Sequence, residues 1–209
     1  HFKNFQYNKG SGTDFLGFDN GLRSLNGGIN ATLRPMNNGY DLLNNGLNND
    51  WSIKNRKPIA DLSLSMNIAH RWVSESGRTL AMLGAVNYSN TYKTDLNMDN
   101  TLYGAYDITH DRSNYVRKGV DAQLNQNVRV GAMLNLTYVP ASGNNRYEFK
   151  NIFYQLGKDS YTYRMGTDAQ SDYEESAVYY YQSRTTYSGQ FTGKHRWSDT
   201  ETLDWSAGY

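Results

Sequence analysis

Four aspartates that lie close together are the densest group of potential metal ligands in this sequence. Asp95, Asp99, Asp107 and Asp111 all fall within residues 93–114. Carboxylate oxygens are suitable calcium ligands, but the spacing of these four does not match that of an EF-hand loop. An acidic surface loop explains the cluster better, and we therefore predict no metal site here.

The other residue types that could support catalysis do not form a catalytic motif. Glu174 and Glu175 are adjacent, so on a strand they point to opposite faces and cannot act as a paired acid and base. The sequence has no cysteine, no serine-hydrolase elbow, no phosphate-binding glycine loop and no H-E-x-x-H motif. We therefore predict neither an enzyme nor a resident metal or cofactor. The four histidines lie in separate segments, as His1, His70, His110 and His195.

Aromatic residues in predicted loops are the remaining side chains with a binding chemistry. Their rings present large apolar faces that could stack on sugar rings or hold a peptide. The same rings could equally pack the loops against one another. The candidate ligand-contacting residues are Phe15, Phe18, Tyr40, Trp51, Tyr103, Tyr106 and Tyr161.

Composition excludes several classes of protein. The chain has 209 residues, with 21 lysines and arginines against 20 aspartates and glutamates, and its net charge is +1. This balance argues against a nucleic-acid partner, which usually requires a basic excess. No apolar run approaches the roughly 18 residues of a helical membrane span. With 18 tyrosines, 19 glycines and only 3 prolines, the chain is predicted to be all-β.

Alternation of apolar and polar residues is strongest over residues 116–138. Apolar residues occupy the even positions and polar residues the odd ones for more than 20 residues, about twice the usual strand length. A helix would spread such a pattern over all its sides. One long strand therefore explains the segment best, and two shorter strands with a break near Gln126 are the alternative.

Similar alternation predicts about seven strands, joined by connections of unequal length. Long loops are expected on one side of the sheet and short turns on the other. The alternating segments are residues 2–7, 62–72, 80–88, 116–138, 147–156, 173–191 and 203–209. The long loops are residues 8–58, 93–114 and 157–172, and the short turns are residues 73–77, 140–145 and 194–200.

This organisation predicts an antiparallel transmembrane β-barrel, because such barrels have long loops on one side only and alternate apolar and polar residues along each strand. A sandwich would have shorter strands. The odd strand count and the abrupt chain ends predict a fragment in which residues 1–209 belong to one barrel domain, with 8–58 as an extracellular loop and 59–209 as strands and loops. The residues expected to contact lipid are Leu62, Leu64, Met66, Ile68, Leu80, Met82, Val86, Tyr88, Ala132, Leu134, Leu136, Tyr138, Tyr179, Tyr181, Tyr187 and Phe191.

Several strings in this order resemble a known family of receptors. The run TDFLGFDNGLR at residues 13–23, AVNYSN at 85–90, VRVGAMLNL at 128–136 and FKNIF at 149–153 look like TonB-dependent receptors that carry an N-terminal carboxypeptidase-regulatory-like domain. The resemblance extends over nearly the whole chain. It implies a barrel of about 22 strands with an internal plug, of which this chain would be an early third.

The resemblance also implies a function, a location and partners. Such receptors lie in the outer membrane of Gram-negative bacteria and import a scarce nutrient, such as a metal chelate, glycan or peptide, by TonB-coupled active transport. The expected partners are outer-membrane lipid, the substrate, the TonB complex through parts of the parent protein outside this sequence, and in some cases a surface lipoprotein. No plug, TonB box or closing strand is recognisable in this sequence.

Three other functions remain open from the residues alone. A small barrel with an adhesin or structural role would need an eighth strand, and residues 2–7 are too short to supply it convincingly. A soluble β-sandwich that binds carbohydrate would not require detergent. A barrel enzyme would need acids with a histidine, or a serine with a histidine, near one rim, and no such group can be placed.

Overall fold

The computed structural model describes residues 5–8, 10–23, 52–168, 170 and 172–209. These residues form eight strands and one short 3-10 helix. The elements are β1 (Phe5–Asn8), η1 (Asp14–Leu16), β2 (Ile53–Arg56), β3 (Leu62–Val73), β4 (Thr79–Asp107), β5 (Arg112–Val139), β6 (Asn145–Asp168), β7 (Tyr173–Arg196) and β8 (Thr202–Gly208).

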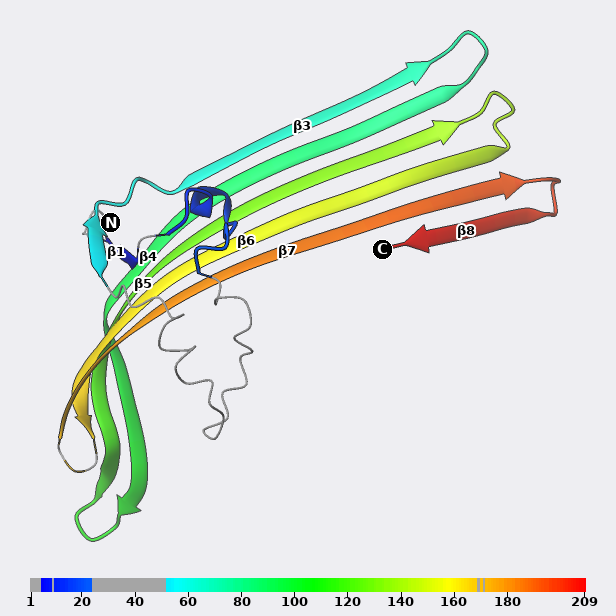
Figure 1. Cartoon of the computed structure of the whole chain (residues 1–209). Helices are drawn as coiled ribbons and strands as arrows, with labels where there is room; N and C mark the ends of the chain where they lie inside the picture. The colour runs from blue at the N-terminus through cyan, green and yellow to red at the C-terminus, as the bar shows by residue number, and fades with distance from the viewer. Residues whose placement is uncertain (1–4, 9, 24–51, 169, 171) are drawn as a thin grey trace, which may run out of the picture.

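Six strands form one large antiparallel sheet in which each strand pairs with the next along the chain. The order is β3-β4-β5-β6-β7-β8, while β1 and β2 form a separate two-stranded sheet (Figure 1). The all-β, antiparallel prediction is therefore confirmed. The sheet is open, because no described strand pairs with the outer edge of β3 or of β8. Among the described residues, no helix is long and apolar enough to cross a membrane.

The central strands are much longer than the sequence pattern predicts. Strands β4 and β5 have 29 and 28 residues, and β6 and β7 have 24 each. The segment 116–138 lies within the single strand β5, where Gln126 pairs with both Tyr92 and Asp159. The alternative of a break near Gln126 is therefore wrong.

The predicted long loops at 93–114 and 157–172 are also wrong, because strands continue through both. Strand β4 runs to Asp107 and β5 begins at Arg112, while β6 runs to Asp168 and β7 begins at Tyr173. Asparagine and aspartate disfavour strands on their own, but here a neighbouring strand bonds their backbone groups. Register shifts after Asp95 and Leu102 accommodate the irregular sequence of β4.

The strand count differs from the prediction of about seven in one respect. The large sheet contains six strands, and the first predicted strand instead becomes β1, which pairs with β2 in the small sheet. The end of the predicted loop 8–58 thus contains a strand, β2, that pairs with β1 at the start of this loop, with Phe5 opposite Arg56. Residues 24–51 lie outside the described part of the chain.

Register places every predicted lipid-contacting residue on one face of the large sheet. Residues that lie opposite each other in an antiparallel pair point to the same side. The pairs run across the sheet from Met66 to Val86, Ala132, Phe153 and Tyr187. We call this side the apolar face. The opposite side, the polar face, carries Ser65, Asn87, Arg129, Asn135 and Gln190.

Candidate functional site

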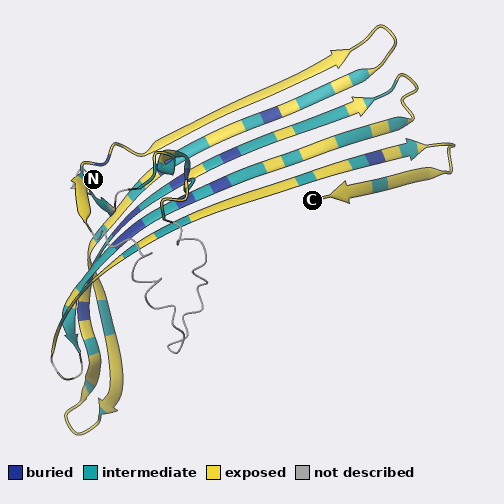
Figure 2. Ribbon diagram, in the orientation of Figure 1, coloured by how far each residue is buried: buried dark blue, intermediate teal, exposed yellow. Residues whose placement is uncertain are grey.

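A band of mainly apolar side chains, interrupted by His70 and Asn151, covers the apolar face near the short turns. On β4 the band runs from Leu80 to Tyr88, about 26 Å at the usual rise per residue. This matches the 9–11 residues of a transmembrane strand. Its side chains are largely exposed, for example 69% for Met66 and 54% for Val86. Figure 2 shows β3 and β8 exposed over most of their length.

Aromatic side chains gather where the band ends at the short turns. Trp205 packs edge-to-face against Phe191, with ring centroids 5.2 Å apart, and Tyr138 stacks on Tyr147 at 6.4 Å. The Trp205 indole N–H donates to His195 Nε2 at 2.9 Å. Amphipathic rings of this kind form the interface girdles of membrane barrels. Trp72 and Phe149 are further aromatic residues at this end.

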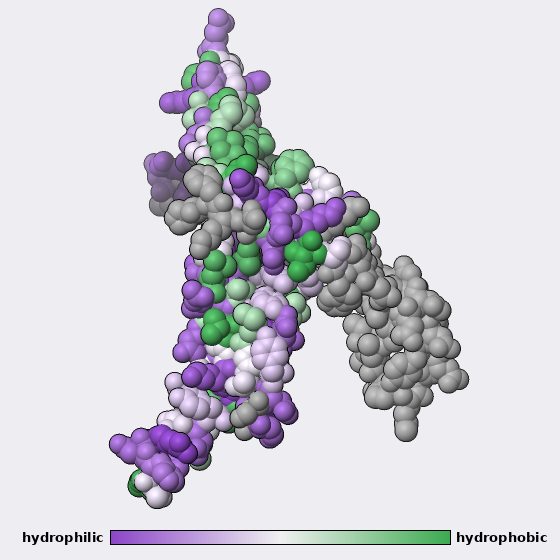
Figure 3. Space-filling model, turned by 90° about the vertical axis from the view of Figure 1, so that its left-hand side faces the viewer, coloured by the Kyte–Doolittle hydropathy of each residue, from purple (hydrophilic) through white to green (hydrophobic). Residues whose placement is uncertain are grey.

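Beyond Tyr88 the apolar face carries both polar and apolar side chains, and another part of the chain packs on it. We call the described residues 5–8, 10–23 and 52–60 the N-terminal cover. Phe5 of the cover is buried with Leu124 and Tyr161 of the sheet. This is the main core cluster of the described residues, and Figure 2 shows buried segments of β5 and β6 near it. Figure 3 shows hydrophobic residues in the middle of the molecule and mostly hydrophilic residues towards the β4–β5 tip.

The cover contacts the sheet most closely where two glycines meet. Gly17 has a left-handed φ of 80°, and a Cβ on it would lie 2.7 Å from the backbone nitrogen of Gly157. The Gly17 carbonyl accepts hydrogen bonds from the Gln155 amide and from Ser183 Oγ. Gln155 is fully buried, and Thr185 donates to its Oε1. This polar anchor holds the cover in one register on the sheet.

We predict that Gly157→Ala loosens the N-terminal cover without disturbing the sheet. The new Cβ would lie only 2.4 Å from Gly17 Cα, and overpacking of this kind costs about 1–3 kcal/mol. Hydrogen exchange of the amides in residues 10–23 should accelerate. Gly143→Ala, at a turn with φ 68° and open space around it, is the control, and the same acceleration there would contradict the prediction.

The string at residues 13–23 folds into a compact turn closed by charges. Arg23 binds both Asp14, at 2.6 Å, and Asp19, at 3.0 Å. Its guanidinium also lies 3.7 Å above the centre of the Tyr181 ring, a cation–π contact. Burial opposes ionisation of Asp14, but hydrogen bonds from Arg23 and Ser11 outweigh it and hold the pKa of Asp14 below its ordinary value.

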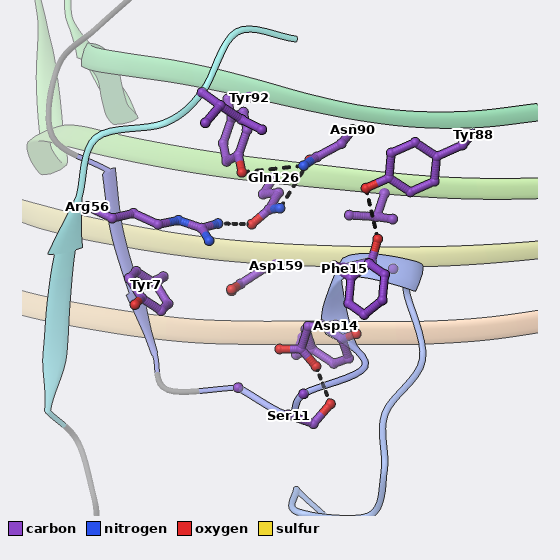
Figure 4. Close-up of a pocket in the computed structure, with 16 residues that line it drawn as sticks. Tyr7, Ser11, Asp14, Phe15, Arg56, Tyr88, Asn90, Tyr92, Gln126 and Asp159 are labelled. Carbon is purple, nitrogen blue, oxygen red and sulfur yellow. Dashed lines mark hydrogen bonds between the residues drawn. The ribbon is translucent and has the colours of Figure 1, made fainter. Parts of the chain in front are cut away.

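A cavity of about 530 Å³ lies between the cover and the apolar face (Figure 4). Arg56 enters it from β2, donates to the Gln126 side chain, and lies 4.6 Å from the centre of the Tyr7 ring. Gln126 in turn donates to Asn90 Oδ1 at 3.0 Å. The volume is within the range of ligand sites. The other lining residues that matter below are Tyr92, Tyr181, Asp159, Asp14, Phe15 and Tyr88.

Three polar groups in this cavity have no hydrogen-bond partner within the described part of the chain. Arg56 Nε and the Tyr181 hydroxyl are both buried and unbonded. The Asp159 carboxylate receives no hydrogen bond, and desolvation raises its pKa to about 6, with Asp14 adding to this and Arg23 and Arg56 opposing it. Burial likewise raises the pKa of Tyr181 to about 12. The cavity thus holds an unused donor and an unused acceptor.

The predicted ligand-contacting aromatics do not assemble into one site. Phe15 lines the cavity, whereas Phe18 stacks on Phe153 with centroids 6.3 Å apart. Tyr161 is a buried core residue.

Two more of these predicted aromatics, Tyr103 and Tyr106, lie on the exposed β4–β5 hairpin. The Tyr103 ring packs against Tyr115, and the Tyr106 hydroxyl donates a hydrogen bond to Asp111. Tyr40 and Trp51 lie outside the described residues.

Sequence reasoning missed the polar residues of the cavity. Asn90, Gln126 and Asp159 occupy the apolar positions of their strands, and polar residues there, just past the apolar band, are the signal that could have found them. Arg56 lies in a stretch that reads as an irregular loop. The predicted lipid-contacting residues Tyr179 and Tyr181 lie on the apolar face, but beside the cover rather than in the band.

The acidic cluster and the histidines do not form a metal site in the described residues. Asp107 pairs with His110 at 2.7 Å, and Asp95 pairs with Lys93 at 2.9 Å. The best-buried carboxylate is instead Asp121 on the polar face, which Arg164 binds through two hydrogen bonds of 2.7 and 2.8 Å. Those bonds hold the pKa of Asp121 below its ordinary value.

Two features of the described residues bear on function, the apolar band and the cavity beside it. Comparisons with family models, curated proteins and solved structures find no match. Function is therefore inferred from the chemistry of these two features.

Proposed function

We propose that this chain is part of an outer-membrane β-barrel receptor of the TonB-dependent type, which imports a scarce nutrient. The observation that carries the proposal is the apolar band on one face of the six-stranded sheet. The band is exposed over the width of four to six strands, and contiguous exposed apolar surface of this extent marks a contact with lipid or with another protein. Its height and its aromatic edge match a bilayer.

The polar face supports a barrel rather than a buried sheet. Charged and amide side chains lie there at the same level as the band, including Arg71, Asn135, Glu148, Lys150 and Asp204. Glu148 is ion-paired with Lys150 at 2.7 Å. In a barrel this face would line water while lipid covers the other. A closed barrel would also pair the open edges of β3 and β8 with further strands, because unpaired edges are costly in hydrocarbon.

Transport itself is proposed from the resemblance of the sequence strings to TonB-dependent receptors. Energy coupling through the TonB complex, and any surface lipoprotein, would involve parts of the parent protein outside this chain. A soluble carbohydrate-binding sandwich would need a second large sheet over the apolar face. In the described residues only the N-terminal cover, with β1, β2 and η1, packs on that face, and it reaches the band only at its edge, where Phe18 stacks on Phe153.

Site-directed spin labelling tests the proposal, because the chain has no cysteine of its own. Val86→Cys and Asn87→Cys place labels on the apolar and polar faces of the same strand. In the full-length protein in outer membranes, we expect the Val86 label to be relaxed by dissolved oxygen and shielded from a water-soluble nickel chelate. The Asn87 label should show the opposite preference.

The neighbouring pair on β5, Leu134→Cys and Asn135→Cys, repeats the comparison on a second strand. Nickel accessibility at both faces, in a protein that stays in solution without detergent, would contradict the membrane proposal and favour a soluble binding module.

A further inference from the structure

The cavity under the N-terminal cover lies on the outer side of the proposed barrel, not on the side that would line its lumen. Its floor is formed by Asn90, Gln126 and Asp159, which continue the apolar face beyond Tyr88. This placement outside the barrel rests on the proposed function. In such a barrel the cavity would be level with the lipid headgroups of the leaflet that lies farther from the short turns.

The walls of the cavity combine aromatic rings with groups that form directed hydrogen bonds. Tyr7, Tyr88, Tyr92 and Phe15 supply rings from both the cover and the sheet. The planar side chains of Arg56, Asn90, Gln126 and Asp159 lie between them (Figure 4). A ligand with an apolar face and a polar rim fits this combination, because aromatic faces pack against the former and polar groups orient the latter.

The unbonded polar atoms specify hydroxyl groups as the polar rim. Asp159 needs a donor, Arg56 Nε needs an acceptor, and the Tyr181 hydroxyl can be either. A hydroxyl both donates and accepts, so vicinal hydroxyls can satisfy all three. Leaving buried polar groups unpaired is unfavourable, and a hydroxyl-rich ligand would relieve this cost.

The charges around the cavity disfavour an anionic ligand. Asp14 and Asp19 are bound to Arg23, and Asp159 lies near Arg56. Of the described residues that line the cavity, Arg56 is the one cation and Asp14 and Asp159 are two carboxylates, so the lining has no positive excess to attract a phosphate. A neutral ring with hydroxyl groups is the ligand that these contacts favour.

We infer that this cavity binds a neutral saccharide ring, and that its position beside the lipid band makes the sugar headgroup of an outer-leaflet glycolipid the occupant. A hydroxyl of the sugar would donate to Asp159 and another would accept from Arg56. The Tyr88 and Tyr181 rings would contact its carbon–hydrogen faces. The cover would then close over the headgroup on the outer wall of the barrel.

Calorimetry on the full-length protein tests this inference, in a detergent without a sugar headgroup so that the detergent does not compete. The probes are lipopolysaccharide and the oligosaccharide released from it by removal of its lipid and phosphates. We expect both to bind, and lipopolysaccharide to bind more tightly. Asp159→Asn and Tyr181→Phe should each weaken binding of the oligosaccharide about tenfold, which is the loss expected for one hydrogen bond to a charged or buried group.

The matched control is Asp95→Asn, which removes a carboxylate that pairs with Lys93 outside the cavity and should bind like wild type. Hydrogen exchange of residues 10–23 confirms that the cover stays docked in each variant. No binding of either probe, or binding unchanged by both cavity variants, would overturn the saccharide site. If inorganic phosphate competes with the oligosaccharide, the inference that the ligand is neutral is wrong. If both probes bind equally tightly, the inference that the sugar belongs to a glycolipid is wrong. If the saccharide binds but the Val86 and Asn87 labels show no difference in accessibility to oxygen and nickel, the saccharide site stands and the membrane location is rejected.

Discussion

Leu134→Arg is expected to destabilise the membrane-inserted protein by about 2–4 kcal/mol, the cost of arginine near the bilayer midplane on the lipid face of a barrel. Leu134 lies in the middle of the band, between Gly84 and Asn151 in register, and its side chain is 41% exposed. Asn135→Arg places the same charge one residue further on the polar face, where water would solvate it. We expect its effect to be small.

Reversible unfolding in urea from lipid vesicles, together with gel mobility before and after heating, measures this difference. Leu64→Arg provides a depth control. Leu64 lies in the row of Tyr88, at the margin of the band, where the cost of arginine falls to about 0–1 kcal/mol. Equal losses of stability in Leu134→Arg and Asn135→Arg would contradict the assignment of the apolar face to lipid, whatever the result for Leu64→Arg.

The parts of the fold that follow from side-chain period were predictable from the sequence. Alternation along residues 62–68, 80–88 and 132–138 fixes which face each residue occupies, and strand pairing then aligns the apolar residues of neighbouring strands. The short turns at one end also carry a local signal, since glycine adopts a positive φ at Gly77 and Gly143.

The extent of the strands and the cavity depend on non-local contacts and were not predictable in this way. The segment 93–107 contains several residues that disfavour strands, yet it pairs with 112–125 across the hairpin. Neither Gly17 nor Gly157 signals in sequence that the two backbones meet. Likewise, Asp159 becomes unusual only because a segment far away in the chain covers it and removes its water.

Docking of the N-terminal cover should weaken as the pH rises from about 4.5 to 7. Burial raises the pKa of Asp159 to about 6 from an ordinary value of 3.8, so the docked state holds this proton more tightly than the undocked state. Stability gained from the proton is complete below the ordinary pKa and is lost as the pH passes through 6. A shift of about two units corresponds to about 3 kcal/mol.

Asp159→Asn should remove this pH dependence, because asparagine stays neutral and keeps the packing of the protonated acid. The variant's cover should therefore dock more tightly than that of the wild type at pH 7, and the difference should become smaller at pH 5. Hydrogen exchange of residues 10–23, corrected for the intrinsic rate at each pH, measures both. The lower limit of this pH range leaves Asp14 ionised. Because the pKa of Asp14 is lowered, its ion pair with Arg23 breaks only in stronger acid. Protection that increases with pH, or a slope that persists in Asp159→Asn, would mean that another group controls docking of the cover.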